Sequence, residues 1–224
     1  MGLIVGLLDL LYPPRCPFCG ALLPREDRTC PQCADAPFWI RPEQAVTEGR
    51  YCSRVVCAGW YQKSLRQSML RFKFNGRQEY ARSCGPVLAR RIRQFLPGAY
   101  DVISWMPVSA VTLKDRGYDQ ARLLAEAVAE SLGTKAEPLL EKTGRNVPQS
   151  SLTDRRKRRA NVAGVYAVLN PEAVRGRRVL LIDDILTTGA TLEEGARVLR
   201  AAGAVQVVAA AFCRTPRTGS KEEK

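Results

Sequence analysis

The spacing of hydrophobic residues from residue 51 onward predicts strands and helices in alternation. Apolar runs predict strands at 55–61, 100–108, 162–169, 178–183 and 204–213. Spacings near 3.6 residues predict helices around 65–70, 80–95, 119–132 and 191–202. Glycine follows each of the last two helices, as is common at helix ends. Such alternation is typical of an α/β fold, with a mainly parallel sheet and helices on both faces.

The remaining segments divide the chain into four predicted parts. Residues 1–38 hold an apolar N-terminal stretch and a cysteine-rich module, 39–50 read as a linker, 51–216 form the α/β domain, and 217–224 form a disordered tail. The N-terminal stretch contains Asp9 and lacks a basic leader, so we expect no secretory signal. It is interpreted as a short helix against the protein body, with a membrane-surface anchor as the alternative. No apolar run is long enough to span a membrane.

Two cysteine pairs in the N-terminal part have the spacing of a zinc site. The pairs are Cys16-x-x-Cys19 and Cys30-x-x-Cys33, with ten residues between them. Paired CxxC turns can place four thiolates around one tetrahedral Zn²⁺, and Gly20 suits the tight turn of the first pair. Two redox-active or disulfide pairs are the alternative, which the expected cytoplasmic location disfavours.

The other four of the eight cysteines lack this spacing. Cys57, Cys84 and Cys213 lie in apolar periodic segments and are predicted to be small core residues. Cys52 could belong to a second metal site, although no paired cysteine accompanies it. The sequence leaves the role of Cys52 open.

The net charge of +13 is confined to the part of the chain after residue 60, because earlier acidic and basic residues cancel. The densest basic stretch is 142–159. Such a field favours anionic partners, either phosphorylated small molecules or nucleic acid. The chain has no histidine, which excludes the commonest general base and metal-binding imidazole.

The stretch VLLIDDILTTGAT (179–191) places two acids at the end of a buried strand and a small polar loop before a helix. Backbone N–H groups at a helix N-terminus bind anions, and small residues let a phosphate come close. The acids Asp183 and Asp184 would repel a phosphate, so they suit the two hydroxyl groups of a ribose, or a cation. The predicted phosphate-binding residues are Thr187, Thr188, Gly189, Ala190 and Thr191.

Other interpretations of this stretch are weaker. A strand–turn–helix with capping residues needs no ligand. A P-loop would require Gly-Lys-Ser/Thr, and a receiver domain would carry its acidic pair on the first strand. Internal ion pairs on both acids, without an open concavity beside 187–191, would argue against the ribose–phosphate interpretation.

The stretch 179–191 resembles the phosphoribosyl-diphosphate motif of type I phosphoribosyltransferases. RGYDQA (116–121) is similar to the RGFNQA signature of the ComF/GntX competence-protein family, with Tyr118 for Phe and Asp119 for Asn. Asp119 weakens any role that needs an amide donor. Residues 146–166 and the four-Cys module also resemble that family, so the resemblance covers nearly the whole chain and implies the type I phosphoribosyltransferase fold.

The resemblance also implies further site residues. A loop at 107–110 would bind the diphosphate through Val108, Ser109 and Ala110, with Lys114 and Arg116 nearby. A flexible loop over the reacting centre would correspond to 146–166, with Arg155 and Arg158 reaching the diphosphate, although this basic run could equally be a solvated patch. Lys73 is a weaker candidate, since a lone lysine beside apolar residues is usually a surface residue. Mg²⁺ would accompany the diphosphate.

The activity implied is displacement of diphosphate from C1 of 5-phosphoribosyl 1-diphosphate by an unknown acceptor, in a DNA-uptake setting. The alternative is a non-catalytic accessory protein that keeps the ribose-phosphate pocket and binds single-stranded DNA or a DNA-uptake helicase. Basic charge supports the alternative, but a content of 7% aromatic residues provides few side chains on which DNA bases could stack. The sequence leaves open whether the chain forms a homodimer.

Overall fold

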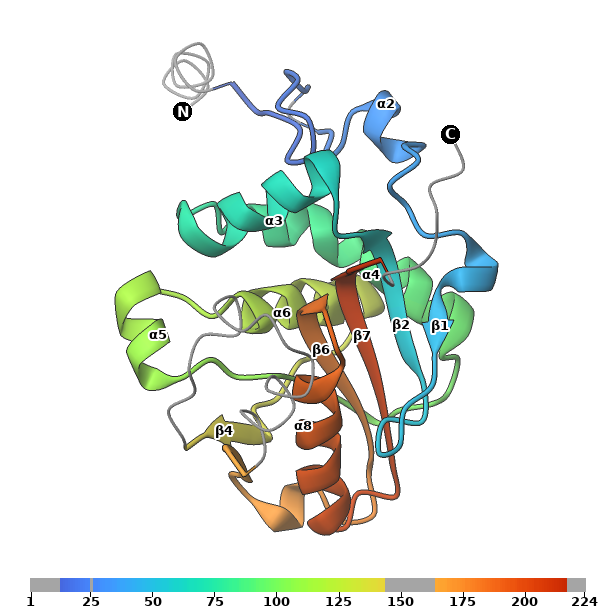
Figure 1. Ribbon diagram of the computed structural model, residues 1–224, viewed down its shortest axis with the longest axis vertical. Helices are drawn as coiled ribbons and strands as arrows, with labels where there is room; N and C mark the ends of the chain where they lie inside the picture. The colour runs from blue at the N-terminus through green and yellow to red at the C-terminus, as the bar shows by residue number, and fades with distance from the viewer. Residues whose placement is uncertain (1–12, 25, 144–163, 217–224) are drawn as a thin grey trace.

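A five-stranded sheet forms the centre of the computed structural model, which describes residues 13–24, 26–143 and 164–216 (Figure 1). The strands lie in the order β1-β2-β7-β6-β3, and only β1 is antiparallel to its neighbour. This arrangement confirms the predicted mainly parallel sheet. The strands are β1 (Val46–Thr47), β2 (Val55–Trp60), β3 (Val102–Trp105), β6 (Arg178–Leu186) and β7 (Gln206–Arg214).

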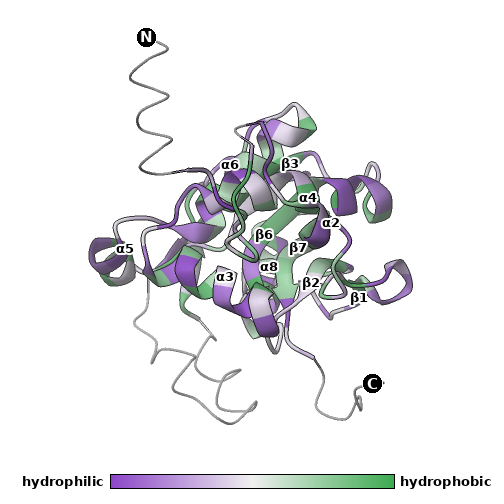
Figure 2. Ribbon diagram, turned by 90° about the horizontal axis from the view of Figure 1, so that it is seen from above, coloured by the Kyte–Doolittle hydropathy of each residue, from purple (hydrophilic) through white to green (hydrophobic). Residues whose placement is uncertain are grey.

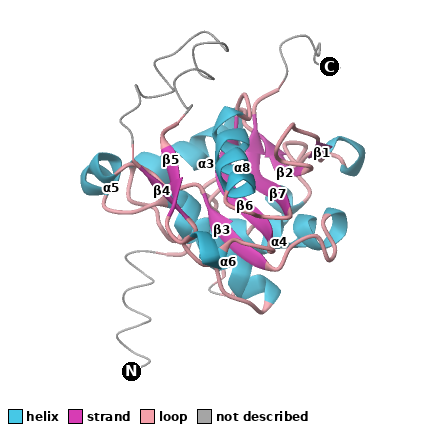
Figure 3. Cartoon of the chain, turned by 90° about the horizontal axis from the view of Figure 1, so that it is seen from below, coloured by secondary structure: helices cyan, strands magenta, loops and turns pink. Residues whose placement is uncertain are grey.

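Helices cover both faces of the sheet (Figure 3). One face carries α3 (Lys63–Phe74), α4 (Tyr80–Phe95) and α6 (Gln120–Leu132), and the other carries α8 (Ala190–Ala201). Alternation along β6 supplies both cores, since Leu180 and Ile182 belong to the first and Val179 and Leu181 to the second. Figure 2 shows the hydrophobic residues concentrated on these central strands. Among the described helices, none is long and apolar enough to cross a membrane.

The segment 39–50, predicted to be a linker, contacts the sheet directly. It contains the short helix η1 (Pro42–Gln44) and strand β1, which pairs with β2. Ile40 is fully buried, and its N–H donates to the carbonyl of Ala58 at 2.9 Å. These contacts join the cysteine-rich module, which includes α2 (Pro31–Ala34), to the edge of the sheet.

A second, two-stranded sheet corrects the prediction for residues 162–169. Within the described part of this segment, the strand is only β5 (Tyr166–Val168). It pairs antiparallel with β4 (Leu140–Lys142) rather than joining the main sheet. The short helix η3 (Pro171–Ala173) then leads to β6. The small sheet lies beside α8 and contributes Leu140 and Tyr166 to the core on that face.

Helices α4 and α6 meet where Gly85 faces Ala127. A Cβ atom at Gly85 would lie 2.5 Å from the Ala127 Cβ and 2.7 Å from its carbonyl carbon. We therefore expect Gly85→Ala to destabilise the protein by about 2 kcal/mol, because the two backbones would have to separate. Helix propensity alone predicts that the substitution stabilises the protein, since alanine is more favourable than glycine in a helix by about 1 kcal/mol. Urea unfolding decides between them, with Arg90→Ala on the exposed side of α4 as the control.

Candidate functional site

Two neighbouring acids at the carboxyl end of β6 point toward opposite faces of the sheet. Asp184 continues the positions of Leu180 and Ile182, and Asp183 continues those of Val179 and Leu181. Asp184 is buried and Asp183 is half-buried. The Asp184 N–H donates to the Asp183 Oδ1 at 2.8 Å. The acids therefore face different surroundings, although the sequence treats them as one pair.

Asp184 forms an ion pair with Lys73 on α3. The Lys73 Nζ lies 2.8 Å from the Asp184 Oδ2, and both side chains are largely shielded from solvent. Burial alone would lower the pKa of the Lys73 ammonium, but the charge and hydrogen bond of Asp184 outweigh it and raise that pKa. Lys73, the weaker candidate in the sequence, thus lies inside the site. An internal ion pair on both acids was one part of the condition that would argue against the ribose-binding interpretation, and Asp184 has such a pair.

Asp183 lies in an environment that disfavours its charge. Burial, followed by the negative charge of Asp184, raises the pKa of Asp183 to about 8, and Lys73 opposes the shift. Lys142, at the end of β4, interacts electrostatically with Asp183, although burial lowers the pKa of its ammonium. Burial and then the charge of Asp183 raise the pKa of Tyr166 on β5. Lys142 and Tyr166 are therefore neighbours of the site that the sequence did not identify.

The loop after β6 has the predicted strand–loop–helix geometry. Gly189 is the N-cap residue just before α8, and its φ of +82° is a backbone conformation that favours glycine. The Thr188 hydroxyl accepts from the Ala190 N–H at 3.3 Å, and Thr187 is exposed. Thr191 is the second residue of α8, so all five predicted residues lie at the helix N-terminus. Their binding of a phosphate remains a prediction.

The loop after β3 lies at the same edge, because β3 and β6 are parallel neighbours. It leads into α5 (Ala110–Arg116), whose first turn is capped by Ser109, the acceptor of the Thr112 N–H at 3.1 Å. The Val108 N–H donates to the Asp119 Oδ2 at 3.1 Å. Val108, Ser109 and Ala110 thus lie at the same edge of the sheet as the acids, and Lys114 is exposed on α5.

Asp119 acts as a hydrogen-bond acceptor at the start of α6. Its second oxygen accepts from the Arg122 N–H at 3.1 Å, which caps the helix. Burial raises the pKa of Asp119, although the backbone N–H groups of Val108 and Arg122 counteract this effect. The two contacts use different carboxylate oxygens. Asparagine has a single carbonyl oxygen and its amide nitrogen is a donor, so the asparagine of the RGFNQA signature would keep only one of these contacts in the same geometry.

Two predicted site residues, Arg155 and Arg158, lie outside the described residues, as does most of the segment 146–166. The described site residues come from four parts of the fold. The two acids lie on β6, the 187–191 loop leads from β6 into α8, the 107–110 loop connects β3 to α5, and Lys73 lies on α3. Arg116, at the end of α5, contacts Gln120 rather than a site acid. Gln120, which is 1% exposed, was also missed. Its place inside the RGYDQA signature was the signal that could have identified it, because a buried glutamine needs hydrogen-bond partners.

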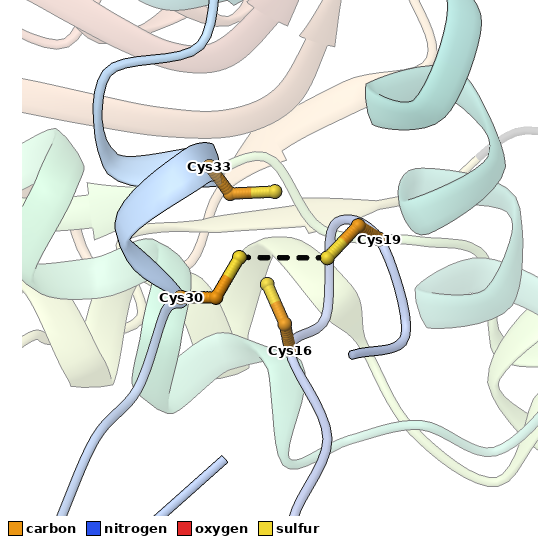
Figure 4. Close-up of side chains that lie close together, drawn as sticks. All are labelled: Cys16, Cys19, Cys30 and Cys33. Carbon is orange, nitrogen blue, oxygen red and sulfur yellow. Dashed lines mark hydrogen bonds between the residues drawn. The ribbon is translucent and has the colours of Figure 1, made fainter. Parts of the chain in front are cut away.

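The four cysteines of the N-terminal module converge (Figure 4). Their Sγ atoms all lie within 4.8 Å of one another, and Cys19 and Cys30 approach to 3.5 Å. Four thiolates around one zinc ion would stand roughly 3.8 Å apart, given Zn–S bonds of about 2.3 Å. Burial alone would raise the pKa of the Cys16 thiol, but backbone N–H groups lower it to about 7. Burial and neighbouring thiols raise the pKa of Cys33, since the ligand thiolates repel one another until a cation joins them.

The cysteine module packs on the main sheet through aromatic rings. Phe18, between the first two cysteines, stacks on Phe212 of β7 with ring centroids 6.2 Å apart. The Trp39 Nε1–H donates to the Cys33 carbonyl at 2.8 Å. Cys52 is buried in the core of the opposite face, away from the cluster. The described residues therefore hold one four-cysteine site, which shares its core with the α/β domain.

Comparison with known families gives two matches, to separate parts of the chain. The phosphoribosyl transferase domain family matches residues 90–224, and the double zinc ribbon domain family matches residues 7–56. The second match covers a doubled ribbon, whereas the described part of this chain has one four-cysteine cluster. These matches agree with the fold and with the four-cysteine zinc ribbon predicted from the sequence.

Relatives of similar length confirm the ComF/GntX resemblance. Competence protein ComFC of Bacillus subtilis is 27% identical over 82% of this chain and 70% of the relative. DNA utilization protein YhgH of Escherichia coli is 27% identical over 89% of this chain and 84% of the relative. A solved structure described as the allosteric regulatory enzyme of purine biosynthesis has a TM-score of 0.41 and 21% identity. That likeness covers 63% of this chain and 29% of the enzyme, so this chain spans less than a third of it.

Proposed function

The chain belongs to the phosphoribosyl transferase domain family, and on that premise we propose that it binds 5-phosphoribosyl 1-diphosphate and transfers the phosphoribosyl group. The observation that carries the proposal is the carboxyl end of β6. There, a half-buried acid precedes a loop that turns at Gly189 into the N-terminus of α8. Backbone amide groups at such a helix N-terminus favour binding of a phosphate, and the carboxylate of Asp183 on the preceding strand favours hydrogen bonds from hydroxyl groups.

The residues of the site suit separate parts of the ligand. The 187–191 loop would hold the 5-phosphate, and Asp183 would accept hydrogen bonds from the ribose hydroxyls. The 107–110 loop, at the same edge of the sheet as the acids, would hold the diphosphate. Mg²⁺, when bound, would supply positive charge to the departing diphosphate. Asp183 offers it a carboxylate, whereas an oxygen of Asp184 is engaged by Lys73, so ligand oxygens would complete the coordination.

The chemistry required of the protein is electrostatic. Cleavage of the bond between C1 and the diphosphate leaves positive charge on the ribose and adds negative charge to the leaving group. Lys73 offsets the charge of Asp184, so that the acids repel the ligand less. The acceptor, which would form the new bond to C1, is not specified by the described residues. The names of the relatives support a role in the handling of DNA, and we keep the cytoplasmic location as a proposal.

Isothermal titration calorimetry tests the proposal. At pH 9 with Mg²⁺ present, where Asp183 with its pKa of about 8 is ionised, we expect Asp183→Asn to reduce the affinity for 5-phosphoribosyl 1-diphosphate by about tenfold to a hundredfold, since charge-assisted hydrogen bonds contribute about 1.5–3 kcal/mol. Asp27→Asn, which changes an exposed acid in the zinc ribbon, serves as the matched control. A wild-type protein that gives no binding heat would disprove the proposal.

The second candidate function is binding of single-stranded DNA or of a DNA-uptake helicase, without turnover. The charge of +13 and the relatives' names favour it. Oligonucleotide binding measured at increasing salt separates the candidates, because phosphate contacts make affinity fall steeply with salt. Turnover is tested by incubation with the activated sugar and a cell extract, followed by a search for a ribosylated product by mass spectrometry.

A further inference from the structure

The last turn of α3 is held residue by residue by the segment 116–120. The contacts join a side chain of that segment to each of three consecutive residues of α3. The Tyr118 hydroxyl donates to the Phe72 carbonyl, the Gln120 Nε2 donates to the Lys73 carbonyl at 3.5 Å, and the Arg116 guanidinium lies 5.1 Å from the centre of the Phe74 ring. We call the segment 116–120 the α3 clamp.

Burial makes these contacts specific. Tyr118 is 7% exposed and Gln120 is 1% exposed, so each needs a partner for its polar group. The Gln120 amide uses both ends, because its oxygen accepts from Arg116 while its nitrogen reaches the Lys73 carbonyl. Gly117, with φ +81°, ends α5 and allows the sharp turn that brings Tyr118 and Gln120 to the same helix end.

The clamp acts at the helix end that carries the site cation. Lys73 is the penultimate residue of α3, and exposed residues from Phe74 to Gly76 follow it. Helix ends fray unless other contacts hold them. The Lys73 ammonium must nevertheless stay 2.8 Å from an Asp184 oxygen on another element, 111 positions along the chain.

We propose that the α3 clamp positions Lys73 against Asp184, and that Tyr118 and Gln120 are positioning residues that act through Lys73. The consequence for the ligand rests on the proposed function. A sugar with a phosphate and a diphosphate is repelled by Asp183 and Asp184, and the held ammonium offsets part of that repulsion. Loss of the clamp therefore weakens ligand binding by releasing Lys73, without removing any group that touches the ligand.

Chemical labelling of lysines tests the positioning without any ligand. Trace acetylation followed by peptide mass spectrometry measures the reactivity of each amine in the folded protein. Tyr118→Phe removes one hydroxyl and keeps the ring, and we expect it to raise the labelling rate of Lys73 about fivefold, the factor for one neutral hydrogen bond. Exposed Lys135 is the internal control. An unchanged Lys73 rate, or an equal rise at Lys135, would overturn the proposal.

A double-mutant cycle tests whether the effect passes through Lys73. We expect Tyr118→Phe to reduce affinity for 5-phosphoribosyl 1-diphosphate about fivefold in the wild-type background and not at all in a Lys73→Met background. Equal losses in both backgrounds would contradict the proposed role, because a purely structural effect does not depend on Lys73. Tyr80→Phe, on the neighbouring helix α4, is the control. If wild-type protein binds no sugar, the proposed function fails, and the labelling experiment still decides the role of the clamp.

Discussion

Cys30→Ser is expected to reduce zinc content below about half an equivalent and to destabilise the fold by at least about 3 kcal/mol. The value is a small part of the roughly 10–16 kcal/mol with which isolated zinc-finger peptides hold zinc, because the rest of this domain has its own core. Loss of zinc affects that core directly, since Cys16, Phe18, Cys30 and Cys33 belong to the same buried cluster as Phe212.

Cys52→Ser provides the matched comparison for this prediction. Cys30 and Cys52 are both buried, so each change replaces a buried thiol with a hydroxyl. Only the first removes a predicted zinc ligand. We expect Cys52→Ser to keep about one equivalent of zinc and to lose less stability in thermal unfolding. Equal zinc content in the two variants, measured by plasma emission spectroscopy, would contradict the assignment of the four-cysteine site.

The main sheet was predictable because its strands carry local signals. β6 and β7 are long apolar runs, and the alternation along each supplies two cores at once. The position of Gly189 was predictable for the same reason, since a turn with positive φ is encoded by the residue that adopts it. Short elements carry too few residues for such a signal, so β1 and β4 were missed.

The centre of the site depends on contacts between distant residues. Lys73 and Asp184 meet because α3 crosses above the carboxyl edge of β6, and neither local stretch specifies that partner. Asp183 and Asp184 read as one pair in the sequence, yet the alternation of the strand turns them to different faces. The sequence identified Tyr118 and Gln120 only as positions of a family signature and indicated no contact for either. Their role as donors to the backbone of α3 follows from contacts that the connection between α5 and α6 and the first residue of α6 make with the last turn of α3.

Asp183→Asn is expected to stabilise the folded protein above neutral pH. The pKa of Asp183 rises from 3.8 to about 8 on folding, with burial as the main cause and Asp184 next. Between these values the folded state holds a proton that the unfolded state has lost, so this group lowers stability as pH rises toward 8. Asparagine cannot ionise, so the variant lacks this loss. The gain is on the order of a few kcal/mol at pH 8.5, since one pKa unit corresponds to about 1.4 kcal/mol.

Urea unfolding at pH 6, 7 and 8.5 in magnesium-free buffer measures this effect as the difference between variant and wild type. The difference cancels the pH dependence of the zinc site, which both proteins share. Asp27→Asn should show no such trend, because that acid is exposed. If the free energies of unfolding of wild type and Asp183→Asn differ by the same amount at all three pH values, the raised pKa of Asp183 is contradicted. Combined with calorimetry, the variant should gain stability and lose affinity for the sugar, because Asp183 is then a group that binds ligand at the expense of the fold. A structural acid would show the reverse, with lower stability and unchanged affinity.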